Sequence, residues 1–478
     1  MPRNIVYFIK KHRSALLTAL FIALLALILG SASARADRYV VNARYDAQTH
    51  TLHVTQNICM TNRTGQPLED LCLNLPANAY AAASTAPVPR SERELAYPDG
   101  FDAGGVIITQ LRIAGQDAAY HLEGEQQTLL CAALPFALRK NGSLTVELEY
   151  TLTLPRSRLR MGYSAQDVRL GNAFATLALH DGQDFYRDGY FPVGDPFLSA
   201  CADWEVTLTA PPEYTAAGAG FLSEENGTWR FHLRRARDFA LFLSPDWQTA
   251  QTELHGITLR SHAFNEAGAQ AALQQAAQAL DVFTQLFGDY PYEDFTVCAG
   301  DFYTGGMEYP GLALIDRTLY ESDDGMLEFV VAHEAAHQWW YAAVGSDQIR
   351  HPWQDEALAE YATLLYYESH YGAQSFDSLY QAMIRPATEV EALRGVGVDQ
   401  PLYKFESNAL YDALIYRKGA AMLHDVRVHM GNDAFIASLR RYYEDNRYCV
   451  AAPDALQAAL GETGAAVLNA WLRGEAPR

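Results

Sequence analysis

Basic residues are scarce in this chain of 478 residues: 36 Lys and Arg stand against 57 Asp and Glu, a formal net charge of −21. Nucleic-acid binding requires clustered Lys and Arg to contact the phosphates, and the sequence has no basic stripe and no zinc knuckle. It also lacks a phosphate-binding loop, because the glycine-rich segment GGMEYPG (305–311) carries neither a Lys nor a following helix start. We therefore expect no nucleic-acid partner.

Cysteine is equally scarce, with six residues in the chain, which excludes a scaffold built on disulfides. No CxxC pair is present, so a thiolate metal site is not expected. Cys59 and Cys72 flank a turn-rich stretch and could pair across a hairpin; two buried free thiols are the alternative, and the sequence does not decide between them. The other cysteines lie in apolar or aromatic surroundings and are expected in the core: Cys131, Cys201, Cys298 and Cys449.

One segment lacks charge altogether. Residues 15–30 (ALLTALFIALLALILG) are uncharged, follow four basic residues, and precede Ala34-Arg35-Ala36, which fits a small-residue cleavage site. This order is typical of an export signal, but the run is slightly long for one and slightly short for a membrane span. Residues 1–36 are thus predicted to be a signal peptide or, alternatively, a signal-anchor. In both cases the remainder is exported, either secreted or tethered to the outer face of the cytoplasmic membrane.

The exported part has the composition of a globular protein and a length that suits several domains. From residue 37 to 247 the sequence alternates apolar and polar residues, with turn formers such as Asn141-Gly142 and Asn226-Gly227 between the runs. This pattern predicts an antiparallel all-β N-terminal domain over residues 37–247.

The pattern changes near residue 248. The segment EAGAQAALQQAAQALDVFTQLFG has apolar residues at helical spacing and stops at Gly288, and the chain is mostly helical from Asp324 onward. Residues 248–478 are therefore predicted to form a second, mainly helical domain, and the whole chain an α+β multidomain protein.

The segment VVAHEAAHQWW contains the pattern HExxH. His333 and His337 are four residues apart, so a helix places both imidazoles on one face, where both can reach one ion. Glu334, beside the first histidine, can then act as the general base that takes a proton from the attacking water. The pattern alone is short enough to occur by chance, so its surroundings matter.

A catalytic zinc site requires a third protein ligand. Glu356 follows His337 after 18 residues, enough to finish one helix, turn and begin another that packs back on the first. Glu360, one helical turn later, can hydrogen-bond a ligand imidazole or, equally, face solvent. Asp355 and Glu368 are expected to face water. The neighbouring aromatic residues are expected to form the core that fixes the two helices: Trp339, Trp340, Tyr341, Trp353 and Tyr361.

HExxH, 18 residues, then Glu resembles the M1 family of zinc aminopeptidases, a branch of the gluzincins. The resemblance covers nearly all of the exported chain. It implies a β domain followed by a thermolysin-like zinc peptidase domain with one Zn²⁺ ion held by His333, His337 and Glu356. It also implies a short form without the large C-terminal helical domain of many members.

Gly305, Gly306, Met307 and Glu308 resemble the exopeptidase motif of that family, Gly-x-Met-Glu-Asn. The resemblance implies an edge strand that aligns the substrate, with Glu308 binding its free α-amine. The chain departs from the motif at Tyr309, where the family usually has Asn.

Two further segments carry the resemblance. In YDALIYRKGAAML, Tyr416 matches the tyrosine that stabilises the tetrahedral oxyanion; Tyr411 is expected to assist it or simply to pack. In QDFYRDGYFPVGDP, counting nine residues back from Pro192 assigns Gln183 a part in binding the α-amine.

The expected function is therefore an exported zinc aminopeptidase that acts on peptides with a free N-terminus, with Glu334 and Tyr416 as catalytic residues. Two alternatives stay open. A thermolysin-like endopeptidase would use the same two helices, although the Gly-Gly-Met-Glu segment argues against it. A non-catalytic binding protein on a peptidase fold would more often have lost HExxH, the third ligand or the tyrosine.

Overall fold

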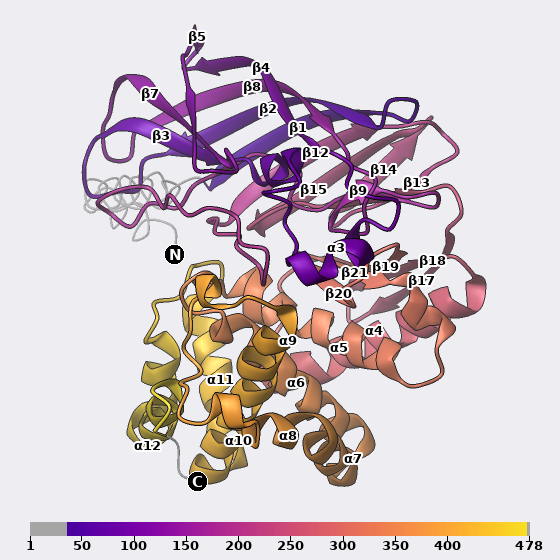
Figure 1. Cartoon of the computed structure of the whole chain (residues 1–478), viewed down its shortest axis with the longest axis vertical. Helices are drawn as coiled ribbons and strands as arrows, with labels where there is room; N and C mark the ends of the chain where they lie inside the picture. Colours follow the sequence, from indigo (N-terminus) through magenta and orange to yellow (C-terminus); the bar gives the residue numbers. More distant parts are fainter. Residues whose placement is uncertain (1–35, 476–478) are drawn as a thin grey trace, which may run out of the picture.

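The computed structural model describes residues 36–475. Strands fill one half of the molecule and helices the other, with a smaller sheet between them (Figure 1). This arrangement confirms the predicted fold class, a β domain followed by a mainly helical domain. The predicted export signal lies, apart from Ala36, outside the described residues. Within residues 36–475 no helix is both long and apolar enough to cross a membrane.

An eight-stranded sheet dominates the N-terminal half, in the order β14-β15-β12-β1-β2-β8-β4-β5. Its strands are β1 (Asp37–Asp46), β2 (Thr51–Thr61), β4 (Gly105–Ile113), β5 (Gln116–Asp117), β8 (Ser143–Thr153), β12 (Ala202–Thr209), β14 (Phe221–Glu225) and β15 (Thr228–Ala236). Alternate residues of β1 are buried, among them Tyr39, Val41 and Ala43, as the alternating sequence pattern predicts for a sheet with one wet face.

The eight-stranded sheet departs from a purely antiparallel one at a single pair, because β1 and β12 run parallel. They are far apart in sequence, so a long connection joins them, as a parallel pair requires. Tyr39 of β1 stacks on Trp204 of β12 at 4.2 Å between ring centroids, and Trp204 is fully buried. This contact anchors the pair in the core.

Two four-stranded sheets complete the N-terminal half. One has the order β13-β16-β10-β9 and consists of β13 (Thr215–Ala217), β16 (Leu241–Ser244), β10 (Val168–Leu170) and β9 (Met161–Tyr163). The other has the order β11-β3-β7-β6 and consists of β11 (Thr176–Leu177), β3 (Leu68–Asn74), β7 (Leu129–Leu138) and β6 (His121–Glu123).

The single disulfide among the described residues joins Cys72 on β3 to Cys131 on β7. A bridge between Cys59 and Cys72 was the wrong pairing, because β2 and β3 do not form a hairpin and β3 pairs with β7 instead, with Cys72 directly opposite Cys131. Cys298 is buried as expected, but Cys449 is exposed and Cys201 only partly buried.

A five-stranded sheet opens the second half, in the order β17-β18-β19-β21-β20. Its strands are β17 (Gln248–Leu254), β18 (Ile257–Ala263), β19 (Asp294–Gly300), β20 (Gly306–Tyr309) and β21 (Leu312–Asp316). The sequence pattern predicts a mainly helical domain here, so this sheet is a finding of the structure. The edge strand β20 is antiparallel to β21 and contains the Gly-Met-Glu segment.

Three helices pack against one another beside this sheet: α4 (Glu266–Phe287), α5 (Met326–Ala336) and α6 (Trp353–Tyr371). Helix α4 begins where the Asn265 side chain accepts a hydrogen bond from the Gly268 amide, and it ends at Gly288, whose φ of 112° few other residues adopt. In α6 every residue from Trp353 to Tyr366 is buried, acids included. Buried acids need partners, and these partners form the site below.

The remaining α-helices are α3 (Arg93–Ala96), α7 (Ala373–Leu379), α8 (Arg385–Thr388), α9 (Asn408–Tyr411), α10 (Gly419–Met430), α11 (Asn432–Asn446) and α12 (Ala455–Leu472). The aromatic residues near HExxH are buried as expected, and Trp340 stacks on Tyr442 of α11 at 6.1 Å between ring centroids. Aromatic packing therefore ties α11 to the segment that follows α5.

Candidate functional site

Helix α5 brings two imidazoles to one point. His333 lies in its last turn and His337 at its C-cap, and both side chains are buried. The two Nε2 atoms are 3.1 Å apart. Helix spacing alone explains this meeting, because residues four apart stack on one face.

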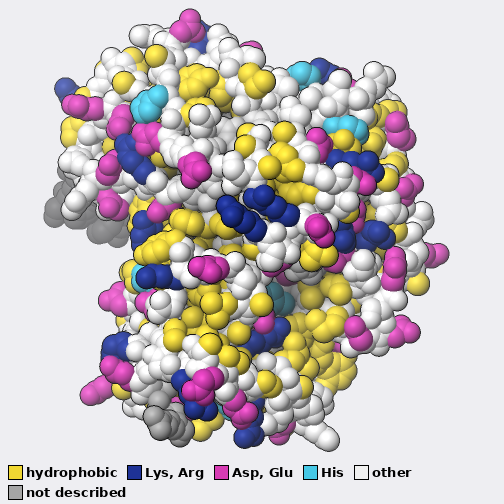
Figure 2. Space-filling model, viewed as in Figure 1, with side chains coloured by type: hydrophobic (Ala, Val, Ile, Leu, Met, Phe, Trp, Pro, Cys, Tyr) yellow, Lys and Arg dark blue, Asp and Glu magenta, His cyan; other side chains and the backbone are white. Residues whose placement is uncertain are grey.

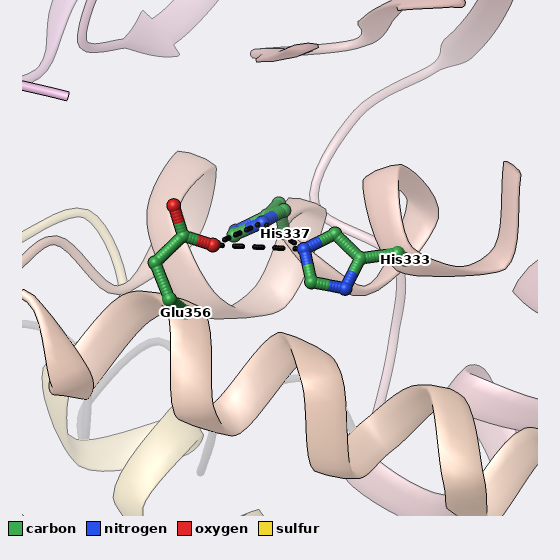
Figure 3. A group of neighbouring side chains, drawn as sticks. All are labelled: His333, His337 and Glu356. Atoms are coloured by element: carbon green, nitrogen blue, oxygen red, sulfur yellow. Dashed lines mark hydrogen bonds and ion pairs between the residues drawn. The ribbon is translucent and has the colours of Figure 1, made fainter. Parts of the chain in front are cut away.

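Helix α6 adds a carboxylate from its first turn. The Glu356 Oε2 atom lies 3.6 Å from His333 Nε2 and 3.3 Å from His337 Nε2 (Figure 3). Ligands of a tetrahedral zinc ion lie about 3.4 Å apart, given zinc–ligand distances near 2.1 Å. Glu356 Oε2 is buried and has no hydrogen-bond partner among the described residues. The spacing and this unpartnered oxygen fit a zinc ion held by the three side chains.

Each ligand imidazole also contacts a second carboxylate through its other nitrogen. Asp355 Oδ1 lies 2.7 Å from His337 Nδ1, and Glu360 Oε2 lies 3.3 Å from His333 Nδ1. Such contacts orient a metal-binding imidazole and raise its basicity. The expectation that Asp355 faces water was wrong: α6 is enclosed on all sides at this point, and Asp355 is only 1% exposed. Glu368, beyond the enclosed part, is partly exposed and pairs with Arg427.

Glu334 is positioned beside the three ligands by the same helix. Its carboxyl is 4% exposed, and Oε2 has no hydrogen-bond partner among the described residues. Burial raises the pKa of Glu334 to about 7, although the two histidines act in the opposite direction. A cation on the neighbouring ligands would lower this pKa again.

Glu308 reaches the site from the edge strand β20. Two hydrogen bonds fix this edge, because the Gln338 side chain donates to the Tyr309 carbonyl and accepts from the Gly311 amide. Glu308 is 5% exposed, and burial raises its pKa well above the usual range. No hydrogen bond or ion pair to its side chain occurs among residues 36–475.

Each of the two glycines before Glu308 is favoured at its position for a different structural reason. Gly305 has a φ of +94°, a conformation that other residues rarely adopt. At Gly306 a Cβ atom would lie 2.3 Å from the Glu334 carboxylate, so the strand passes directly over the candidate base. Met307 also lines the cleft, and its sulfur lies 3.4 Å from Arg160 Nη1 of the N-terminal half.

Two tyrosines form the opposite wall. Tyr416 belongs to the π-helical segment η8 (Asp412–Lys418), and its ring lies nearly parallel to that of His333, with 5.7 Å between centroids. Tyr411 meets Tyr416 edge to face at 5.6 Å. Burial raises the pKa of both phenols well above 10, so both hydroxyls remain protonated donors.

One cleft, with a volume of about 520 Å³, lies between the two halves of the molecule. It is lined by His333, Glu334, His337, Glu356, Glu360, Glu308, Tyr411 and Tyr416. Figure 2 shows hydrophobic side chains gathered around this hollow face. The N-terminal half contributes Tyr190, Asp195 and Arg160 to its wall.

Gln183 does not line the cleft. It is exposed in a surface turn, where its backbone N–H donates a hydrogen bond to Asp181 Oδ1. The prediction for Gln183 was wrong because the count ran back through a loop that turns away before the cleft begins. The residues of that segment that line the cleft come later, at Tyr190, Phe191, Pro192, Gly194 and Asp195. Asp195 is the acid among them, and the sequence analysis missed it.

Comparison with known proteins agrees with this geometry. Residues 271–472 match the model of the peptidase family M1 domain. Aminopeptidase N of Lactococcus lactis subsp. lactis is 26% identical over 326 residues, which cover 60% of this chain and 37% of that protein. Aminopeptidase M1 of Arabidopsis thaliana is 29% identical over 221 residues, which cover 42% of this chain and 25% of that protein. The chain thus spans well under half the length of these relatives.

The fold is similar to that of the M1 zinc metallopeptidase from Deinococcus radiodurans, with a TM-score of 0.63 and 20% sequence identity over 93% of this chain and 95% of that one. A two-domain M1 zinc metallopeptidase bound to L-arginine gives a TM-score of 0.66 at 19% identity, over 93% and 94% of the two chains. Residues 271–472 of this chain are therefore similar to a peptidase family M1 domain.

Proposed function

We propose that the protein is a zinc aminopeptidase that removes the N-terminal residue from peptides. The observation that carries this proposal is the convergence of His333, His337 and Glu356 in one cleft with an unpartnered base, Glu334, and an unpartnered carboxylate on an edge strand, Glu308.

The proposed mechanism assigns a task to each side chain. A zinc ion held by His333, His337 and Glu356 would supply Lewis-acid chemistry. Glu334 takes a proton from the attacking water on Oε2 and passes it to the leaving nitrogen. The Tyr416 hydroxyl donates a hydrogen bond to the oxyanion that develops on the scissile carbonyl.

Glu308 supplies the exopeptidase character. A substrate's N-terminal ammonium is a cation, and a buried carboxylate without a protein partner is costly unless a cation meets it. Because Glu308 and the metal ligands are fixed relative to one another, the ammonium can be held only one residue from the bond that is cut. The strand β20 also has a free edge along which a peptide backbone can pair.

Glu334→Gln tests the mechanism, because it keeps the shape of the side chain and removes its proton affinity. We expect turnover of aminoacyl chromogenic substrates to fall by at least 100-fold while zinc content stays unchanged. Addition of a chelator should abolish wild-type activity, and zinc should restore it. Full activity in the variant would refute the role of Glu334.

The rival endopeptidase function makes a different prediction. An endopeptidase would cleave N-acetylated peptides as fast as free ones, whereas the proposed enzyme requires the free ammonium. Glu308→Ala should remove that preference. A binding protein without catalysis would hold zinc and peptide but release no amino acid from any member of a substrate panel.

We also propose that the protein is exported. The Cys72–Cys131 disulfide supports this location, because such bonds form and persist mainly in oxidising compartments. Cell fractionation with N-terminal sequencing of the mature protein tests it. A mature N-terminus near residue 37 indicates cleavage, an intact membrane-associated chain indicates an anchor, and reduced protein in the cytosol would refute export.

A further inference from the structure

A short helical segment of the N-terminal half reaches the cleft. It comprises η2 (Arg90–Glu92) and α3 (Arg93–Ala96), and Figure 1 shows α3 between the large sheet and the helices of the second half. Two of its side chains, Glu92 and Leu95, line the cleft. Leu95 is 54% exposed there, although it is large and apolar. The proposed catalytic steps use neither residue, so their place in the cleft points to another role.

Glu92 connects two walls of the cleft. Its Oε2 atom accepts a hydrogen bond of 3.0 Å from the Tyr303 hydroxyl and one of 2.7 Å from the Asn408 side-chain amide. Tyr303 belongs to the segment that leads into the edge strand β20, whereas Asn408 begins α9, the helix that carries Tyr411. All three residues of this contact line the cleft. The two hydrogen bonds therefore form a bridge across it.

The packing of β20 on α5 shows which way a substrate runs. At the end of β20 the Tyr309 carbonyl accepts a hydrogen bond from Gln338, and at its start a Cβ atom on Gly306 would lie 2.3 Å from the Glu334 carboxylate. Strand and helix therefore run in the same direction. A peptide that has its ammonium at Glu308 and its scissile bond at Glu334 continues towards the start of both elements.

The bridge lies on this side of the scissile bond. Tyr303 precedes Gly306 by three residues, which is at most about 10 Å of chain. The cleft is apolar here, with Met326 and Phe329 from the first turn of α5 and Leu95 from the N-terminal half. An extended peptide covers about 10 Å with about three residues. The space in front of the bridge therefore suits about three residues after the scissile bond.

We propose that Glu92 limits the length of the peptides that the enzyme cleaves. This inference rests on the proposed aminopeptidase function. A short peptide fits in front of the bridge, whereas a longer one has to displace Glu92 from Tyr303 or Asn408. Hydrogen bonds to a charged group contribute strongly, so the displacement weakens the binding of long peptides. The substrate class is therefore short peptides with a free N-terminus.

A series of peptides of increasing length measures this limit. Each begins with leucine, continues with alternating glycine and serine, and is assayed by the leucine that is released. For wild type we expect kcat/KM to fall by about 10-fold or more between peptides with about three and about six residues after the leucine. The fall should lie in KM, because the groups at the scissile bond are the same. Glu92→Ala should remove it, whereas Glu92→Gln, which keeps an acceptor oxygen, should retain most of it.

Glu94→Ala is the matched control. Glu94 is an acid of the same segment, but it is exposed and does not line the cleft, so its loss should leave the length dependence unchanged. Asn408→Ala covers the case in which Glu92→Ala does not fold: it removes only the link to α9 and should also reduce the length dependence.

Three outcomes would overturn the role of Glu92. They are a wild type that cleaves all lengths equally well, a folded Glu92→Ala or Asn408→Ala variant with the wild-type length dependence, and an equal change in Glu94→Ala. If the wild type releases no leucine from any peptide, the dipeptide included, the aminopeptidase function fails instead. The two failures are therefore distinguishable.

Discussion

The two carboxylates behind the ligand histidines should differ in their effect on zinc affinity. Asp355 lies 2.7 Å from His337 Nδ1, within the range of a charge-assisted hydrogen bond. Glu360 lies 3.3 Å from His333 Nδ1 and also forms an ion pair with Arg417. The longer contact and the shared charge both weaken the hold of Glu360 on its imidazole. We predict that Asp355 contributes more.

The magnitude follows from these contacts. Loss of a carboxylate behind a ligand histidine typically costs 10- to 100-fold in metal affinity. Asp355→Asn keeps an acceptor oxygen and removes the charge, so we expect the lower end, about 10-fold or about 1.4 kcal/mol. For Glu360→Gln, we expect about 3-fold, because its charge is already partly compensated by Arg417.

Competition with a fluorescent chelator measures these dissociation constants without reference to catalysis. Glu368→Gln is the matched control: it removes another acid of α6 that is paired with an arginine, but away from the ligands, and should leave zinc affinity unchanged. A larger loss in Glu360→Gln than in Asp355→Asn would refute the argument from contact length and shared charge. Equal losses in all three variants would show that only the total charge of the helix matters.

Three further predictions concern activity and stability. Tyr416→Phe should lower kcat by about 100- to 1000-fold with KM little changed, as expected for the loss of one hydrogen-bond donor to the oxyanion. Steady-state kinetics measure both constants, and a change in KM alone would contradict this role. Replacing Cys72 and Cys131 with Ala should lower the free energy of unfolding by about 4 kcal/mol, since the bridge closes a loop of 59 residues; an unchanged urea midpoint would oppose this. Burial lowers the pKa of His262 to about 4, so neutral His262 contributes fully to stability above about pH 6.5 and the contribution is lost as the pH falls towards 4. His262→Gln should therefore reduce the change in the free energy of unfolding over this pH range by about 3 kcal/mol. Parallel curves of stability against pH for wild type and variant would exclude this role.

Local spacing predicted the centre of the site well. His333 and His337 meet because a helix has a period of 3.6 residues, and the sequence alone carries that information. The gap of 18 residues likewise allowed a second helix to return with Glu356. The alternation of apolar and polar residues in the N-terminal half likewise predicted its strands, because alternate residues of a strand lie on opposite faces of the sheet.

The residues that the sequence analysis missed depend on contacts between distant segments. Asp355 is buried because several helices enclose α6, which no property of its own helix reveals. Cys72 pairs with Cys131 because β3 lies beside β7, and strand order is not a local feature. Gln183 and Asp195 lie within one quoted segment, but only the course of its loop decides which of them reaches the cleft.

The charge of the cleft connects zinc and substrate recognition. Within residues 36–475, five buried carboxylates line the cleft, and a sixth, Asp355, lies behind His337. The five are Asp195, Glu308, Glu334, Glu356 and Glu360. In the part of the chain that the structure describes, only two guanidinium groups pair with members of this set, those of Arg160 and Arg417. When the histidines are neutral and these acids are ionised, the negative charges outnumber the positive ones. Burying this excess negative charge is costly. We expect a divalent ion on Glu356 to compensate one part of it, and the ammonium of a substrate beside Glu308 to compensate another. The same excess negative charge therefore explains why the site should retain a metal and why it should reject a blocked N-terminus.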